Sequence, residues 1–376
     1  MCDFSRYGGA SREWTAVEAA SPTPPPFGSM SLDQMREAVN ADREAAAASL
    51  LPTFAGKVEL IDVTIPARDG SALQGRLYWP SSVAKLSPAL SAATAGPAIY
   101  MHLHGGGYCF GSLASEDAIC ASLAIETAAK TPMVVLNLNY RHTPDYAYPI
   151  AWHDAQDALA WIHAVAVPEY GIDPASVVVG GISAGAHLTA SLVLEQHLGR
   201  LPQPLPAIAG QVLMIPTVVH NRCYEGQVAQ MTSPKVFSYV ENEFAPLLPV
   251  SMITFFTDLL NIKPEDVRAD NALLCPGNVT PEKARGLPPS VFGICGLDPL
   301  RDEGLLYAKL LTEKAGVPTD VHLFRGAPHG FREFDPNKLS VSRDWDATMV
   351  NGIVWALSKP AASNKFDIQV HGEETM

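Results

Sequence analysis

The sequence predicts an α/β fold in which helices cover both faces of a mostly parallel central sheet and a helical cap lies above it. Six short apolar runs, rich in β-branched residues and bounded by Gly or Pro, are typical of buried parallel strands. Helix-length stretches separate most of these runs, and this alternation favours a doubly wound sheet. One interval, residues 220–272, breaks the rhythm because it contains no such run.

The first 80 residues precede the alternating pattern. The stretch "SPTPPPFG" at 21–28 is too rich in proline to be helical, and residues 31–51 then have the pattern of a helix with a polar start. We assign residues 1–55 to an N-terminal helical arm that forms part of the cap. Two β-rich runs follow, and the Arg-Asp-Gly tripeptide at 68–70 between them is a hairpin signal.

The alternating core is expected in two parts, residues 56–219 and residues 273–376. In chain order, the predicted core strands are 98–105, 133–140, 176–181, 209–217, 290–299 and 319–327. Predicted helices between strands include 151–165, 184–198 and 304–316.

Residues 220–272 lie between the two core parts and are rich in aromatic and apolar side chains, among them Phe255 and Phe256. We interpret this interval as a helical cap insertion. The alternative is one long irregular loop, but an unstructured connection of that length is uncommon in compact domains.

The composition argues against two classes of partner. Thirty-nine acidic against 26 basic residues give the 376-residue chain a net charge of −13, which repels nucleic acid and anionic lipid surfaces. No uncharged apolar run is long enough to span a bilayer, and the N-terminus lacks the layout of a secretory signal. We therefore expect a cytoplasmic protein that binds a small molecule, with no nucleic-acid partner and no membrane span. The sequence leaves a homodimer open.

Ser183 is the first candidate for chemistry because it lies between a predicted strand and a predicted helix. Residues 181–185, "GISAG", fit the pattern G-x-S-x-G, and a tight strand-to-helix turn there would expose the Ser183 hydroxyl. Small flanking residues prevent steric collision in such a turn. The following helix also directs its positive end at charge that develops near Ser183.

A serine at neutral pH needs a base to accept its proton and a carboxylate to orient that base. His329 lies on a Gly/Pro-flanked loop after the last predicted strand, and Asp298 lies just beyond the preceding strand. Asp302 and Glu303 are close to Asp298, but we expect them to open the next helix, where acidic residues favour the helix dipole. Packing or exposure is the expected role of five other histidines in predicted helices or strands: His153, His163, His187, His197 and His322.

The glycine-rich turn "HGGG" at 104–107 follows the first predicted core strand. Without a Cβ, its backbone N–H groups can approach a substrate oxygen, and with the N–H of Ala184 they would form an oxyanion hole. A flexible turn is one alternative. Phosphate binding is another, which the absence of G-x-x-x-x-G-K-[ST] disfavours.

Metal and thiol chemistry have weaker candidates. His102 and His104 alternate on a strand and could be metal ligands, but no third ligand accompanies them at a recognisable spacing, so we expect no metal and a bracing role for His104. The six cysteines lie far apart without a C-x-x-C pair, which favours reduced, mostly buried thiols. Cys109 and Cys295 fall near the presumed site and are expected to be packing residues.

Taken together, these motifs resemble the serine esterases of the α/β-hydrolase fold, in the hormone-sensitive-lipase-like branch of carboxylesterases. The matching stretches are "HGGG" at 104–107, "NYRHTPDYAYP" at 139–149, "GISAG" at 181–185, "DPLRDEG" at 298–304 and "HGF" at 329–331. The resemblance implies that Ser183 is the nucleophile, Asp298 the orienting acid and His329 the base. It also implies that the N–H groups of Gly106, Gly107 and Ala184 hold the oxyanion, with no cofactor and no metal.

Two positions depart from the family's pattern. The family often has Asp or Glu where Ile182 stands, and its usual "YRLAPE" reads "YRHTPD" here, so detailed substrate preference does not transfer. The expected activity is hydrolysis of a small or medium carboxylic ester or lactone through an acyl-serine intermediate. The alternatives are a cyclase or acyltransferase that uses the same triad, as the resemblance to fungal members associated with secondary metabolism suggests, and a non-catalytic receptor. A receptor is disfavoured by the presence of His329.

Overall fold

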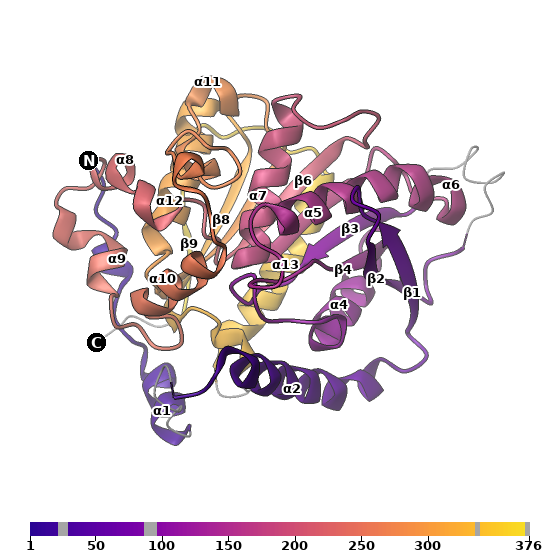
Figure 1. The fold of residues 1–376 in the computed structure, drawn as a ribbon, viewed down its shortest axis with the longest axis horizontal. Helices are drawn as coiled ribbons and strands as arrows, with labels where there is room; N and C mark the ends of the chain where they lie inside the picture. The colour runs from indigo at the N-terminus through magenta and orange to yellow at the C-terminus, as the bar shows by residue number, and fades with distance from the viewer. Residues whose placement is uncertain (22–28, 86–95, 335–338, 373–376) are drawn as a thin grey trace.

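A nine-stranded sheet forms the centre of the protein in a computed structural model that describes residues 1–21, 29–85, 96–334 and 339–372 (Figure 1). The strand order is β1-β2-β4-β3-β5-β6-β7-β8-β9. Strand β2 runs antiparallel to β1 and β4, and the other pairings are parallel, so the predicted α/β class is confirmed. The strands are β1 Val58–Pro66, β2 Ala72–Pro80, β3 Ala98–Leu103, β4 Met133–Asn139, β5 Val177–Ile182, β6 Ile208–Met214, β7 Ser290–Leu297, β8 Thr319–Pro328 and β9 Gln369–His371.

The predicted hairpin and the six predicted core strands all appear in this sheet. Strands β1 and β2 pair along their whole length around the turn at 67–71. Alternate residues of the central strands enter different cores because successive side chains point to opposite faces. In β3, Ile99 and Met101 belong to one apolar core, whereas Tyr100 belongs to the other, and all three are fully buried.

Helices cover both faces of the sheet. Helices α4 and α13 pack together on one face, and α5, α7 and α12 lie on the other (Figure 1). The longer helices are α1 Arg12–Ala20, α2 Leu32–Leu50, α4 Leu113–Ala128, α5 Ile150–Trp161, α7 Ala184–His197, α10 Val250–Leu259, α12 Arg301–Lys309 and α13 Val341–Leu357. Single helical turns are α6 Val167–Tyr170, α8 Glu225–Val228, α9 Ser238–Glu241 and α11 Pro281–Ala284.

Helix α2 begins as the sequence predicts. Ser31 and Gln34 form a reciprocal capping box, in which each side chain accepts from the other residue's backbone N–H. Most of the proline-rich stretch before it lies outside the described residues. Helix α2 packs along α4, and its Leu32, Met35 and Val39 also contact a small apolar cluster that includes Phe256 of α10.

Residues 220–272 contain short helices, of which α8, α9 and α10 lie together on the left of Figure 1, away from β1. From the shared cluster we propose that α2 and this interval act as one cap. The first helix of the same arm packs differently: Trp14 of α1 is buried in the core on the sheet face covered by α4 and α13. Within the described residues, no helix is both long and apolar enough to cross a membrane.

Candidate active site

Ser183 lies at the turn between β5 and α7, with φ 54° and ψ −114°. A positive φ is uncommon for a residue with a side chain and marks local strain that the surroundings must hold. The backbone N–H of Ser183 donates to the carbonyl of Met214 at 2.8 Å. A Cβ on Gly185 would lie 1.9 Å from the Leu103 carbonyl oxygen, so only glycine allows α7 to begin this close to the end of β3.

Ser183, His329 and Asp298 form one hydrogen-bonded chain. The His329 Nε2 lies 2.8 Å from the Ser183 Oγ, and its Nδ1 lies 2.8 Å from the Asp298 Oδ2. A carboxylate can only accept, so His329 carries its proton on Nδ1 and its Nε2 accepts from the serine hydroxyl. The second Asp298 oxygen accepts from the N–H of Leu300 at 2.9 Å, which fixes the carboxylate in its turn.

The glycine turn after β3 lies beside Ser183. A Cβ on Gly105 would be 3.5 Å from the Ser183 Cβ, and Gly106 and Gly107 both have positive φ, 124° and 60°. Among the described residues, the N–H groups of Gly106 and Gly107 donate no hydrogen bond. Ala184 is the first residue of α7, where a helix leaves its N–H groups without intrahelical partners. Gly106, Gly107 and Ala184 line the same cavity as Ser183, and their role as oxyanion donors stays a prediction.

His104 braces the glycine turn. Its Nδ1 donates to the Gly105 carbonyl at 2.9 Å, and its ring stacks on Tyr140 at 4.3 Å. Because Nδ1 carries the proton, the Nε2 of neutral His104 accepts from the Nε2–H of His142 at 3.3 Å. Burial lowers the pKa of His104 to about 4, which keeps the ring neutral at physiological pH.

A buried ionic group lies beneath the same turn. Arg43 of α2 donates to Glu116 at 2.7 Å and reaches the Gly105 carbonyl at 3.4 Å, and Glu116 also binds the His102 Nε2 at 3.0 Å. Burial alone would raise the pKa of Glu116, but Arg43 and His102 outweigh it and lower that pKa to about 2. His102 and His104 thus have separate partners. The described residues contain no group of three side chains arranged to hold a metal ion.

A cavity of about 730 Å³ opens above Ser183 and His329. It falls within the size range of small-molecule sites and has mostly apolar walls with a few polar groups. Helix α2 supplies Met35 and Val39, and α10 supplies Met252, Ile253 and Phe256.

His187 is a polar residue of this cavity that the sequence analysis assigned to packing or exposure. Its Nδ1 accepts from the Tyr108 hydroxyl at 2.5 Å, and both side chains contact the ring of Trp152. Burial lowers the pKa of His187 to about 3, so the ring is neutral. The four-residue spacing from Ser183 could have predicted that His187 lines the same cavity, because residues i and i+4 share one face of a helix.

Asp302 and Glu303 form specific hydrogen bonds in addition to the expected interaction with the helix dipole. Both lie in the first turn of α12 as expected, yet both are fully buried. Asp302 accepts from the N–H of Ser238 at 2.8 Å, and Glu303 accepts from the N–H of Val218 and from the Tyr224 hydroxyl. These carboxylates therefore fasten the 220–272 interval to the core.

All six cysteines are free, and five of them are buried. Burial raises the pKa of the Cys109 thiol and raises that of Cys295 well above its usual value. Both thiols are protonated at neutral pH and are poor nucleophiles.

Comparisons with known proteins agree with this geometry. Residues 100–333 match the model of a family described as alpha/beta hydrolase fold. The chain is 31% identical to carboxylesterase NlhH of Mycobacterium tuberculosis over 69% of this chain and 71% of that protein. Among solved structures, a vibralactone cyclase matches with a TM-score of 0.76 at 27% identity, covering 94% of this chain and 96% of that chain. A bacterial heroin esterase matches with a TM-score of 0.74 at 27% identity, covering 93% and 98%.

The contact between Gly107 and the cap gives a first prediction. A Cβ at position 107 would lie 2.4 Å from the Phe256 Cγ, at a φ that side chains rarely adopt. We expect Gly107→Ala to displace the turn and to lower kcat/KM for p-nitrophenyl butyrate by about 10²-fold or more, as loss of an oxyanion donor does. Gly226→Ala, in the 220–272 interval that also contains Phe256, is the control, because a Cβ there meets nothing within 4 Å. Unchanged kinetics in Gly107→Ala would contradict the assignment.

The buried neutral histidines predict sensitivity to acid. The pKa of His104 is lowered from 6.5 to about 4 in the folded protein. Between pH 6.5 and 4, His104 is therefore protonated in the unfolded chain but neutral in the folded protein. The free energy of unfolding should therefore fall with pH in this window, by up to about 1.4 kcal/mol per pH unit from this group alone. Urea unfolding at pH 7, 6 and 5 measures the slope. His104→Gln should have a shallower slope, and an identical slope would contradict the buried neutral state.

Proposed function

Because the chain belongs to the alpha/beta hydrolase fold family, in the hormone-sensitive-lipase-like branch, and is a carboxylic ester hydrolase, we propose that it acts through an acyl-serine intermediate. The proposed substrate is a small or medium carboxylic ester or lactone. The observation that carries the mechanism is the hydrogen-bonded chain from Ser183 through His329 to Asp298, with both links at 2.8 Å.

In the first half of the reaction, His329 takes the Ser183 proton on Nε2 while the hydroxyl oxygen attacks the ester carbonyl. The negative charge on the carbonyl oxygen is held by the N–H groups of Gly106, Gly107 and Ala184. His329 then gives its proton to the leaving alcohol, and the acyl group remains on the serine. In the second half, water attacks the acyl carbonyl while the His329 Nε2 takes its proton. The bond between the acyl carbon and the Ser183 oxygen then breaks, His329 returns the proton to that oxygen, and the carboxylic acid leaves.

Substrate size is proposed from the walls of the catalytic cavity. Its volume of about 730 Å³ suits a ligand of modest size, and its apolar lining favours a substrate with little charge. Phe256 and Gly107 are in close contact, so the cap aromatic borders the space where the carbonyl would lie. The neutral His187 and Thr217 add polar groups to this wall.

A second candidate function is cyclisation or acyl transfer. The structural similarity to a vibralactone cyclase supports it, because the same acyl-serine could be attacked by an internal or external hydroxyl instead of water. A non-catalytic receptor receives no such support, since His329 lies within hydrogen-bonding distance of Ser183.

The nucleophile can be tested directly. We expect a fluorophosphonate probe to label the native protein and to leave Ser183→Ala unlabelled, since only an activated serine reacts with it. Ser191→Ala is the matched control on the same helix, because its hydroxyl donates to the Leu273 carbonyl at 2.8 Å. Labelling of Ser183→Ala at the native level would reject the mechanism.

The orienting acid can be separated from its acidic neighbours. Asp298→Asn should lower kcat severely, by as much as about 10⁴-fold, because an amide can favour the wrong tautomer of His329. Asp302→Asn should lower stability more than kcat, because Asp302 binds Ser238 and Arg301 and not the histidine. Kinetics with a p-nitrophenyl ester and thermal unfolding distinguish the two variants. The assignment fails if folded Asp302→Asn is inactive while Asp298→Asn is active.

A further inference from the structure

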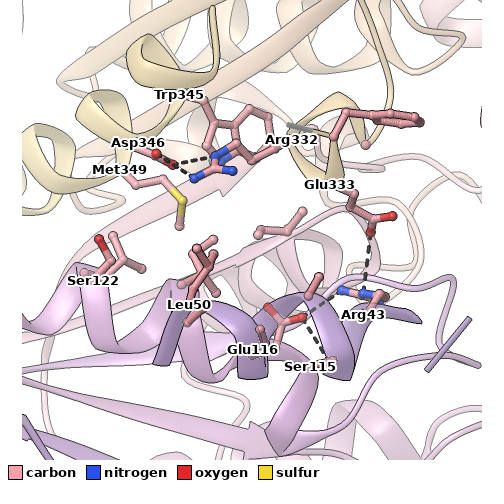
Figure 2. A pocket seen from close by; sticks show the side chains of 18 of the residues that line it. Arg43, Leu50, Ser115, Glu116, Ser122, Arg332, Glu333, Trp345, Asp346 and Met349 are labelled. Carbon is pink, nitrogen blue, oxygen red and sulfur yellow. Dashed lines mark hydrogen bonds and ion pairs between the residues drawn. The ribbon is translucent and has the colours of Figure 1, made fainter. Parts of the chain in front are cut away.

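A second cavity of about 560 Å³ lies among helices α2, α4 and α13. We call it the α2–α13 cavity, and its walls come from α2, α4, the turn at 330–334 and α13. Figure 2 shows Leu50, Glu116 and Ser122 along one side and Trp345 and Met349 along the opposite side. None of these side chains takes part in the hydrogen-bonded chain around Ser183.

The α2–α13 cavity adjoins the catalytic cavity. Six residues line both: Asp42, Arg43, Ile182, Ile215, Gly330 and Glu333. Ile182 directly precedes Ser183, and Gly330 directly follows His329, so this shared wall begins at the reacting groups themselves. The two cavities are therefore neighbours beside Ser183 and His329.

An ion pair crosses the boundary between the two cavities. The Arg43 Nε lies 3.5 Å from a Glu333 carboxylate oxygen, and Figure 2 shows this contact joining the two sides at one end of the α2–α13 cavity. The Glu333 side chain is 59% exposed whereas that of Arg43 is only 16% exposed, so solvent screens this contact from the Glu333 side. Beside the pair, Ile182 and Ile215 form an apolar part of the boundary.

The lining favours an apolar occupant over an anionic one. Leu50, Ile119, Phe334, Trp345 and Met349 are among the apolar side chains of the wall. Both arginines of the wall are already paired, because Arg332 binds Asp346 at 2.7 Å and Arg43 binds Glu116 at 2.7 Å. The wall contains five carboxylates against these two arginines, which disfavours an anion: Asp42, Glu116, Glu126, Glu333 and Asp346.

We propose that the α2–α13 cavity binds the apolar chain of an ester whose carbonyl lies at Ser183. The chain passes beside Ile182 and the Arg43–Glu333 pair and packs between α2, α4 and α13. This inference rests on the proposed ester hydrolysis and adds a substrate class, esters with one extended aliphatic chain. The chain can come from the acyl or the alcohol part, since both leave the same carbonyl.

The test fills the α2–α13 cavity with a larger side chain introduced on α2. Ala46 lines the α2–α13 cavity, Ala38 lines the catalytic cavity, and Ala48 is an exposed residue of the same helix that lines neither. Each is replaced by Trp, and Ala118→Trp on α4 fills the α2–α13 cavity independently. Values of kcat/KM are measured for p-nitrophenyl decanoate against acetate, and for decyl acetate against ethyl acetate, so that the two pairs separate acyl from alcohol chains.

Each methylene that is buried changes binding by about four-fold, so losing contact with two of them lowers the long-to-short ratio by about 16-fold. We expect that fall in Ala46→Trp and Ala118→Trp for one of the two substrate pairs, and no fall in Ala48→Trp. Unchanged ratios in both cavity-filling variants, or a fall in Ala38→Trp alone, would overturn the inference while leaving ester hydrolysis intact.

A direct binding measurement covers the case in which the proposed function fails. If the native protein hydrolyses none of these esters, the proposed function is rejected and the ratios cannot be measured. Calorimetric binding of methyl decanoate to Ser183→Ala then tests the cavity alone. Weaker binding when Ala46→Trp is added, but not when Ala48→Trp is added, supports the site, and equal binding overturns it.

Discussion

The close approach between the end of β3 and the turn after β5 is the constraint on which the rest of the site depends. A Cβ on Gly181 or Gly185 would lie 2.4 Å or 1.9 Å from the Leu103 carbonyl oxygen, far inside contact distance. Because both positions are glycine, α7 begins directly against the chain that leaves β3. The turn at 104–107 therefore lies beside Ser183. The glycines of G-x-S-x-G are needed for this close packing as well as for the chemistry of the serine.

The glycine turn at 104–107 contacts a buried ionic group on one side and Phe256 of the cap on the other. Arg43, Glu116 and His102 form a buried hydrogen-bonded group, and removing one partner from a buried pair of this kind costs about 3–5 kcal/mol. Arg43 belongs to α2, so the helix that lines both cavities is tied to the turn that borders Ser183. Phe256 limits the turn from the other side. The N-terminal arm is thus part of the active-site architecture.

The sequence predicted what local patterns encode. The core strands follow from β-branched runs, the β1–β2 hairpin from the tripeptide at 68–70, and the chain order of Ser183, Asp298 and His329 from their positions after strands. The structure brings these three side chains into one hydrogen-bonded chain, although their catalytic roles remain our proposal.

The remaining features depend on contacts between distant segments. Arg43 meets a carbonyl 62 residues away, and Glu303 meets Val218 across 85 residues. No local pattern reports such contacts, so the buried network, the cap anchors and the α2–α13 cavity were not predicted. His187 is intermediate, because its spacing from Ser183 is local but its partner Tyr108 is not.

Hydrolysis, acyl transfer and cyclisation share the same first half-reaction, so their difference lies in the group that reaches the acyl-serine next to His329. An internal nucleophile requires the substrate chain to fold back onto its own carbonyl inside the catalytic cavity. An acyl chain held between α2 and α13, as we propose, would extend away from that carbonyl beside Ile182 and could not fold back. The space above Ser183 is then left to a small molecule, and water is the nucleophile present at the highest concentration. Occupancy of the α2–α13 cavity by the acyl chain would therefore favour hydrolysis over cyclisation for the same serine, histidine and aspartate.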